Sequence, residues 1–350
     1  MKNKQGYILV LSLMLIFLSM FLATYIANRG SLFSPYARLA IERKQAYVLA
    51  EGGIQLAISQ IVAPKVAAKK EADTKEKKQP SAEDKAKDML SVVLPSLNRW
   101  QGIELNKKRD GIDATLRWCI MSENGKFDLN ALYDFQKHAF KPGPDKADTK
   151  QALKTVFEKI KGQSGDADLF AAFEGIMKKR DYALNDPSEL LGKAFASFAN
   201  ELFYAPPVKG EGEKRPVYLM DLFTVWSGKA TLNPWLLSDS ACAVMGLRRV
   251  SPDDGADRKK RVAEWLKPFK LKSNWQKEWN TVLKPLYQKE FTNIPKSLQP
   301  FLSGTFEAQV FSVLIQAKVG RVTQRLFAII EIGVSKSKQP EAQIKKVYWL

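Results

Sequence analysis

Histidine and cysteine are almost absent from this sequence. Its 350 residues include one histidine, His138, and two cysteines, Cys119 and Cys242. A single histidine excludes most zinc sites and leaves one candidate for a Ser-His-Asp or Cys-His site, and its place in the apolar run 135–140 favours a structural role. Two cysteines cannot make a disulfide framework; they either pair in an oxidising compartment or are unrelated thiols. No phosphate-binding loop or activated nucleophile is present, so the sequence predicts a protein that is not an enzyme.

Acidic residues are also in short supply. Lysine and arginine number 55 against 37 aspartate and glutamate, a net charge of +18, while 45% of the residues are hydrophobic. The length and the apolar fraction suffice for one large domain or two modest ones. The excess of positive charge suggests an anionic partner, which is a nucleic acid, an anionic lipid or an acidic protein.

Charge is missing altogether from residues 7–26. Twenty apolar or neutral residues in a helix span about 30 Å, the thickness of a bilayer core. A cleaved secretory signal has a shorter apolar stretch, so this segment predicts a membrane span, with a plain signal anchor as the simplest interpretation. Lys2 and Lys4 before the span are balanced by Arg29 and Arg38 after it, so charge gives no orientation.

The residues before the span are few and basic, and they end in Gly6 at the apolar boundary. This short leader resembles a prepilin leader, which prepilin peptidase cuts after the glycine, leaving Tyr7 as a methylated N-terminus. Most pilins have glutamate at the fifth mature position, where this chain has Leu11. In lacking it, the chain resembles the GspK-type minor pseudopilins of type II secretion.

The helix is expected to continue beyond the membrane, because apolar residues recur every three or four positions in residues 37–62. The residues of this face are Tyr47, Ile54, Ile58 and Ile61, with Ala50 and Ala57 between them. Pro35 and the pair Gly52-Gly53 are weak points. The sequence QAYVLAEGG in residues 45–53 also resembles that family.

Further along, residues 63–88 lack aromatic residues and predict a solvated linker. Residues 111–121 alternate as a half-buried strand, and Asn124-Gly125 predicts a hairpin into a short strand at 126–129. Strands are expected again at 306–319, 322–332 and 344–350. The order of helix, strands, helices and strands predicts an α+β fold with an antiparallel sheet.

Three apolar stripes predict three helices in residues 146–215, the third running from Leu190 to Leu202 with Asp186 as its cap and Pro187 in its first turn. Helices are also expected at 257–267 and 273–290, the second with a capping box of Ser273 and Gln276. The tryptophans in this lysine-rich region predict an inward apolar face and an outward lysine face. The alternative is a basic, aromatic surface for lipid headgroups or nucleic acid.

Two further motifs resemble the GspK family, each centred on a glycine followed by an asparagine. Residues 121–132 read MSENGKFDLNAL and contain Gly125 and Asn130, and residues 221–237 contain SGKATLN with Gly228 and Asn233. The closing strand KKVYWL at 345–350 is a third similarity. Glycine and asparagine suit the positive φ angles of tight turns, so these residues are expected to be structural.

The resemblance implies a division of the chain. It comprises a leader at 1–6, a membrane-spanning and amphipathic helix at 7–63, a charged linker with a short helix at 64–99, a pilin-like αβ domain at 100–145 and 216–350, and a helical insert at 146–215. The second part of the αβ domain includes the basic, tryptophan-containing helices.

The resemblance also implies a role. Such a protein is a minor pseudopilin at the filament tip that starts pseudopilus assembly. It sits in the bacterial inner membrane with one span and a periplasmic soluble domain. Its expected partners are other minor pseudopilins, the major pseudopilin, prepilin peptidase and membrane lipid, with nucleic acid not expected. No catalytic residue or cofactor is implied; some members bind calcium, for which Asp253, Asp254 and Asp257 are candidates, although a helix cap is the preferred interpretation of these acids.

Two alternatives remain. One is a minor pilin of a type IV pilus or a DNA-uptake machine, to which the net charge gives weight. The other is a signal-anchored periplasmic enzyme that uses carboxylates near the first hairpin, namely Glu123, Asp128 and Asp134.

Overall fold

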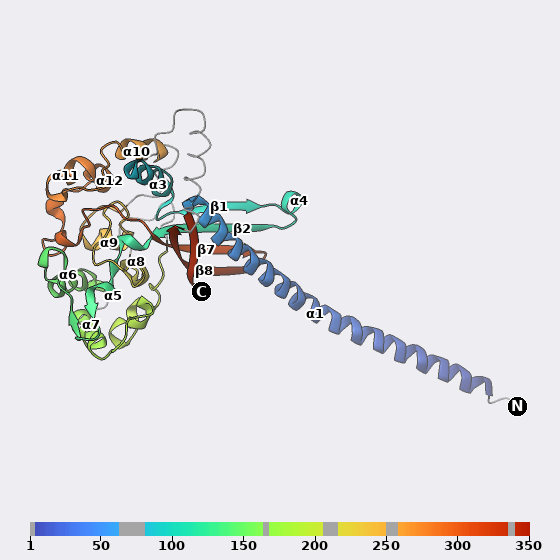
Figure 1. Ribbon diagram of the computed structural model, residues 1–350. Coiled ribbons are helices and arrows are strands. Elements are labelled where there is room, and N and C mark those ends of the chain that lie inside the picture. The colour runs from blue at the N-terminus through green and yellow to red at the C-terminus, as the bar shows by residue number, and fades with distance from the viewer. Residues whose placement is uncertain (1–3, 63–80, 164–167, 206–215, 250–257, 335–339) are drawn as a thin grey trace, which may run out of the picture.

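One very long helix runs away from a mixed body of sheet and helices (Figure 1). The computed structural model describes residues 4–62, 81–163, 168–205, 216–249, 258–334 and 340–350. The body combines an antiparallel sheet with a helical segment inserted between two of its strands. The α+β class predicted from the sequence is confirmed.

Helix α1 extends from Lys4 to Val62 without interruption. At 59 residues it is about 88 Å long, several times a typical globular helix. Pro35 lies inside it, and Gly52-Gly53 does not end it. The predicted continuation of the span into the body is therefore confirmed, and the expected weak points do not break the helix.

The main sheet has five strands in the order β1-β2-β7-β8-β9, all antiparallel. The bounds are β1 Trp100–Leu105, β2 Ala114–Ser122, β7 Val310–Val319, β8 Val322–Val334 and β9 Pro340–Trp349. The second half of α1 packs against β2, β7 and β8, and its Ile54 shares one core with Leu116 and Ile315 of the sheet. The opposite face carries a second cluster that includes Cys119, Leu314 and Phe327.

Neighbouring strands β2 and β7 are separated in sequence by residues 123–309. This segment contributes no strand to the main sheet among the residues described. The domain boundaries drawn from the sequence remain a prediction; the structure adds that the sheet is interrupted directly after β2.

The helices before and within this segment are short. They are α3 Ala82–Ser96, α4 Lys107–Asp110, α5 Leu129–Leu132, α6 Thr149–Ile160, α7 Leu169–Lys178, α8 Leu219–Leu222, α9 Asp239–Val244, α10 Arg258–Trp265, α11 Trp275–Val282 and α12 Lys284–Tyr287. The short strands are β3 Phe127–Asp128, β4 Tyr133–Asp134, β5 Ala139–Phe140 and β6 Phe223–Thr224. The 3-10 turns are η2 Glu123–Gly125, η3 Pro144–Lys146, η4 Lys161–Gln163, η5 Pro187–Leu190, η6 Lys193–Ala199, η7 Phe291–Asn293 and η8 Gln299–Phe301.

Three local predictions were wrong. Asn124-Gly125 forms the turn η2 rather than a hairpin, because β3 pairs in parallel with β6 instead of returning along β2. The third predicted helix consists of the 3-10 turns η5 and η6, since the backbone is extended at Leu191 and Gly192. The Asp186 cap itself is confirmed, because its Oδ1 accepts from the Ser188 amide at 2.9 Å.

The third wrong prediction is the capping box at Ser273. The amide of Ser273 instead donates to the carbonyl of Gly304 at 2.8 Å, and α11 starts from Asn274. The predicted linker lies mostly outside the described residues, but its end is helical. Ser81 begins α3 with a capping box to Asp84.

The predicted orientation of the tryptophans is confirmed. Trp275 and Trp279 of α11 are 7% and 0% exposed, whereas Lys277 between them is exposed. Both belong to the same continuous core as α1 and the sheet. The inserted helices therefore pack as part of one body rather than as a separate unit.

Candidate functional site: an exposed apolar helix and paired turn motifs

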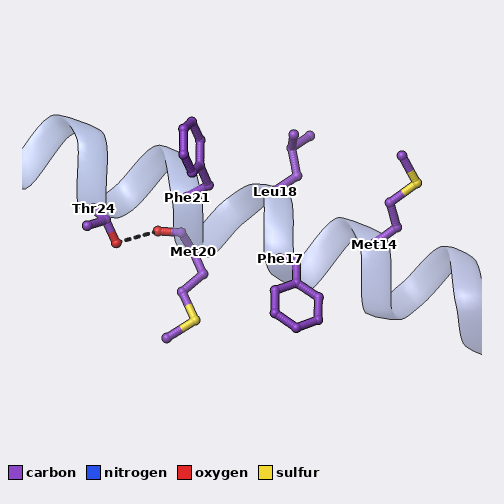
Figure 2. A pocket seen from close by; sticks show the side chains of 6 residues that line it. All are labelled: Met14, Phe17, Leu18, Met20, Phe21 and Thr24. Atoms are coloured by element: carbon purple, nitrogen blue, oxygen red, sulfur yellow. Dashed lines mark hydrogen bonds between the residues drawn. The ribbon is translucent and has the colours of Figure 1, made fainter.

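The first half of α1 has no contacts that bury it. Every described side chain from Val10 to Ile41 is exposed, including Phe17 at 64% and Phe21 at 73%. Figure 2 shows Met14, Phe17, Leu18, Met20 and Phe21 projecting from the helix into open space. Of the residues described, one helix, Val10–Val62, is long and apolar enough to cross a membrane. In water this surface would be costly, so it needs lipid or another apolar helix around it.

Two hydroxyl groups on this surface bond to their own helix. Ser19 Oγ donates to the carbonyl of Leu15 at 2.8 Å, and Thr24 Oγ1 donates to that of Met20 at 2.7 Å (Figure 2). These two hydroxyls are then satisfied without water, as a hydrocarbon environment requires.

The predicted processing site lies at the start of this helix. Gly6 and Tyr7 are in α1, where the structure describes only their backbone, so cleavage between them stays a prediction. Leu11, at the position where pilins have glutamate, is 48% exposed and places an apolar side chain on the surface.

The second half of α1 is built to approach the sheet closely. Its small residues Ala46, Ala50 and Ala57 are fully buried, and a Cβ at Gly53 would lie 2.9 Å from Ile315 Cγ2. Trp118 Nε1 of β2 donates to Gln60 Oε1 at 3.1 Å, a polar contact across the same interface. Small side chains let the helix axis sit near the strands, which fixes the direction in which the apolar half leaves the body.

The edge strand β9 adds an aromatic contact to α1. The rings of Tyr47 and Trp349 stack with centroids 4.1 Å apart. Val48, Ile344 and Val347 extend this apolar surface into an open groove of about 650 Å³ between α1 and β9.

A carboxylate links α1 to the turn between β7 and β8. Glu42 Oε2 accepts from the backbone amide of Arg321 at 3.2 Å, and Glu42 Oε1 accepts from Arg38 Nε at 2.9 Å. The hydrogen bond from the Arg321 amide has the larger effect and that from Arg38 the next; both lower the pKa of the Glu42 carboxyl. The contact marks the level at which α1 leaves the body.

The two glycine–asparagine motifs meet in space. Strand β3 follows the first motif's glycine and pairs in parallel with β6, which precedes the second motif's glycine. Asp128 Oδ2 accepts from Ser227 Oγ at 2.9 Å and from the Gly228 amide at 2.7 Å. Burial raises the pKa of Asp128 against these hydrogen bonds. A carboxylate at this position joins the motifs directly.

Both motif asparagines form side-chain hydrogen bonds to backbone groups that are far away in the sequence. Asn130 Nδ2 donates to the carbonyl of Leu184, and its Oδ1 accepts from the Leu184 amide, both at 2.9 Å. Asn233 Nδ2 donates to the carbonyl of Glu307 at 2.6 Å. These hydrogen bonds fasten the inserted segment to itself and to the residues that lead into β7; that the two asparagines have a purely structural role stays a prediction.

The two glycines serve different purposes. Gly228 has φ +64, as predicted for a turn. Gly125 does not have positive φ, so that part of the prediction was wrong; a Cβ there would lie 1.8 Å from the carbonyl oxygen of Leu236. Close approach of two backbones, rather than turn geometry, requires glycine at position 125.

The candidate carboxylates of the enzyme alternative are engaged in structure. Glu123 is fully buried in an ion pair with Lys126, whose Nζ also donates to the carbonyl of Met220 at 2.8 Å. Asp134 accepts from the amides of Gln136 and Lys137 at 3.1 Å. With Asp128 between the motifs, the three acids occupy separate roles, and the structure does not bring them together around a cavity.

The sequence did not predict the roles of two residues in this region, Asn124 and Lys126. Asn124 Oδ1 accepts from the amides of Gln309 and Val310, both at 3.0 Å, and so positions β7 beside β2. Lys126 is a buried cation, unexpected in a lysine-rich chain where most lysines face water. Their position inside the first motif was a signal, but their distant partners were not readable from the sequence.

Neither cysteine is exposed, and the single histidine lies at the surface beside an aspartate. No disulfide joins Cys119 to Cys242, and both are buried. Burial raises the pKa of the Cys119 thiol well above its usual value, which disfavours the nucleophilic thiolate. His138 is on the surface, with Nε2 3.5 Å from Asp181 Oδ1.

The calcium candidates Asp253, Asp254 and Asp257 lie outside the described residues. Within the described parts of the chain, no group of three or more histidine, cysteine, aspartate or glutamate residues is arranged to hold a metal ion. The suggestion that these acids bind calcium stays a prediction.

Comparisons with known proteins add a limited finding. No family model matches this chain, and the curated proteins contain no match. Among solved structures, the chain is similar to one in the crystal structure of the GspK–GspI–GspJ complex of the enterotoxigenic Escherichia coli type 2 secretion system, with a TM-score of 0.41 and 12% identity over 88% of this chain and 99% of that one. At that TM-score the similarity carries no argument about function, which has to rest on the residues of this chain.

Proposed function

We propose that this chain is a minor pseudopilin of type II secretion, a tip subunit that initiates assembly of the pseudopilus. It is anchored in the bacterial inner membrane by the first half of α1, with the body in the periplasm. Its partners are then other minor pseudopilins and the major pseudopilin, after prepilin peptidase has removed the leader.

The observation that carries this proposal is the division of a single helix between two environments. The first half of α1 exposes a largely apolar surface, and the second half forms part of the core of the body. A helix that only anchored the chain would not need to continue rigidly into the sheet. A subunit that leaves the bilayer and bundles its apolar half with neighbouring helices does need this rigid connection, because the bundle must transmit the position of one body to the next.

Leu11 supports the assignment to the tip. The apolar half of α1 has no carboxylate at the fifth position after Gly6, so this subunit cannot pair there with the terminal amine of a neighbour. A buried charge in an apolar bundle is costly unless it is paired. A subunit with no neighbour beyond it has no use for that carboxylate.

The net charge of +18 favours the second candidate, a minor pilin of a type IV pilus or DNA-uptake machine. Phosphate contacts would make DNA binding by the full chain fall steeply with added salt. Salt-dependent binding of duplex DNA at physiological ionic strength would support this candidate over the secretion role.

The test of the proposal is mass spectrometry of the mature N-terminus from membranes of the native bacterium. A chain that begins at Tyr7 with a methylated amine is the expected result. The variant Gly6→Val should retain its leader and fail to support secretion, with the body still folded. A wild-type chain that still begins at Met1 would leave a plain signal anchor and contradict the proposal.

A further inference from the structure

Positive charge is concentrated at one end of the body. Residues 258–296, which contain α10 to α12, have eleven lysine and arginine residues against three glutamates. This stretch of 39 residues thus holds an excess of eight positive charges out of the whole chain's +18. We name its exposed lysines the lysine cap.

The inner side of this region is apolar and fully engaged. Trp275 Nε1 donates to the carbonyl of Ser303 at 2.6 Å, and Trp279 Nε1 donates to that of Lys289 at 3.1 Å. The guanidinium of Arg258 is buried and donates to the carbonyl of Leu94 at 2.9 Å. The charge that reaches solvent therefore comes from lysine, while the rings and the buried arginine stabilise the body.

The glutamates of the region neutralise only part of this charge. Lys270 pairs with Glu278 and Lys284 pairs with Glu290, each at 2.8 Å. Across the described part of the chain, no ion pair engages the other exposed lysines at 260, 267, 272, 277, 289 and 296. Like charges at this density repel one another, and a partner with carboxylates would relieve that repulsion.

The lysine cap lies far from the membrane-spanning part of the molecule. In Figure 1 α10, α11 and α12 are at the end of the body away from the N-terminus, with the sheet and the rest of α1 in between. The lipid surface that receives the first half of α1 is therefore out of reach of the cap. An anionic partner must approach from the opposite direction.

We propose that the lysine cap is a docking surface for a folded protein that presents an acidic patch. Nucleic acid fits it less well for two reasons. None of the aromatic rings described in residues 258–296 is exposed, so bases find no ring on which to stack. The described arginines, which would supply bidentate phosphate contacts, are buried or half-buried. Carboxylates already pair with lysines within the cap, so the surface is compatible with a protein partner of mixed charge.

The experiment uses the full chain in nanodiscs of neutral phosphatidylcholine and measures binding by fluorescence anisotropy. The cap variant combines Lys267→Gln, Lys272→Gln, Lys277→Gln and Lys289→Gln. The control combines Lys107→Gln, Lys108→Gln, Lys154→Gln and Lys159→Gln, which removes the same charge from exposed positions elsewhere. All eight substitutions are on the surface, so both variants are expected to fold.

The probes are a labelled poly-L-glutamate peptide, a duplex DNA of similar charge, and vesicles that contain phosphatidylglycerol. We expect the cap variant to bind poly-L-glutamate about tenfold more weakly than the wild type, and the control to lose less than about twofold. Equal losses in the two variants, or no binding of poly-L-glutamate by the wild type, would overturn the proposal. Tighter binding of DNA or vesicles, lost in the cap variant alone, would replace it with a nucleic-acid or lipid surface.

Discussion

From Val10 to Ile41 every described side chain of α1 is exposed, whereas Ala46, Ala50, Ile54, Ala57 and Ile61 are at most 4% exposed. The two halves share one continuous backbone. They differ in side-chain size and in what surrounds them: large apolar groups all round in the first half, and a stripe of small and branched residues against the sheet in the second.

This difference suits the two halves of α1 to different surroundings: lipid or neighbouring helices for the first half, and the sheet for the second. The all-round apolar half can pack equally against lipid or against identical neighbours, because no direction is privileged. The second half has one permitted orientation, because the alanines and Gly53 fit only where the strands approach. The body is thereby held at a fixed angle to whatever surrounds the first half.

The largest predicted effect comes from placing the same charge in each half. Ile54→Asp buries a carboxylate with no partner in the core and should lower the free energy of unfolding by about 4 kcal/mol. Leu18→Asp should leave unfolding of the body within about 0.5 kcal/mol of wild type, because its side chain is exposed. Urea unfolding of the full chain in detergent, followed by tryptophan fluorescence, reports the body alone, since all eight tryptophans lie outside α1.

In a membrane the order of the two effects should reverse, and Leu18→Asp should be the more damaging substitution. An aspartate near the centre of the span costs about 3 kcal/mol on insertion, so Leu18→Asp should be released from membranes by alkaline carbonate. Retention of Leu18→Asp together with an unchanged unfolding curve for Ile54→Asp would contradict the division of α1 into two environments.

Substitution of the adjacent residues Gly52 and Gly53 by alanine tests how closely α1 packs against the sheet, because each substitution adds one methyl group. A Cβ at Gly53 would lie 2.9 Å from Ile315 and 3.1 Å from Leu116, so Gly53→Ala should overpack the core and destabilise the body by about 1 kcal/mol. A Cβ at Gly52 would meet nothing within 4 Å. Gly52→Ala should therefore stabilise by about 0.5–1 kcal/mol through helix propensity. Equal shifts in the two unfolding midpoints would show that α1 does not approach the sheet this closely.

The sequence predicted what depends on local pattern. The helix over 7–26 follows from an uncharged apolar run, and the helical face containing Ile54 and Ile61 and the three closing strands follow from periodicity; the structure confirms a helix and three strands there. Both glycine–asparagine motifs were expected to be structural, and the pairing of β3 with β6 places them side by side, although Gly125 and Gly228 meet different requirements.

What failed depends on contacts across the chain. Gly125 was interpreted as a turn residue because Asn-Gly commonly closes hairpins. Its real requirement is the backbone of Leu236, more than a hundred residues later, which no local pattern encodes. Likewise, Ser273 has the spacing of a capping residue, but its amide donates a hydrogen bond to the carbonyl of Gly304 in a neighbouring segment. Tertiary partners decided both cases against the local preference.

A smaller effect is expected at the edge of the packed half. Trp349 stacks on Tyr47 but is 40% exposed, so Trp349→Ala should cost about 1 kcal/mol. The control is Leu350→Ala, the next residue, whose aliphatic side chain is 44% exposed and has no ring to stack on Tyr47. Urea unfolding of the two variants should separate them. If Leu350→Ala destabilised as much as Trp349→Ala, the stack between α1 and β9 would not be contributing.

The smallest predicted effect lies at the boundary between the halves, where Glu42 contacts the β7–β8 turn. The amide of Arg321 and the side chain of Arg38 lower the pKa of Glu42 in the folded chain, so the unfolded chain binds its proton more tightly. The stabilisation is therefore present above the carboxyl's unfolded pKa and is lost as pH falls through its folded pKa. Glu42→Gln should unfold at a lower temperature than wild type near neutral pH, and the gap should close in acid. Because the contact is near the surface, added salt should also narrow the gap. A difference that persisted unchanged in acid would mean that the charge of Glu42 does not hold the turn, and that shape alone fixes the point where α1 leaves the body.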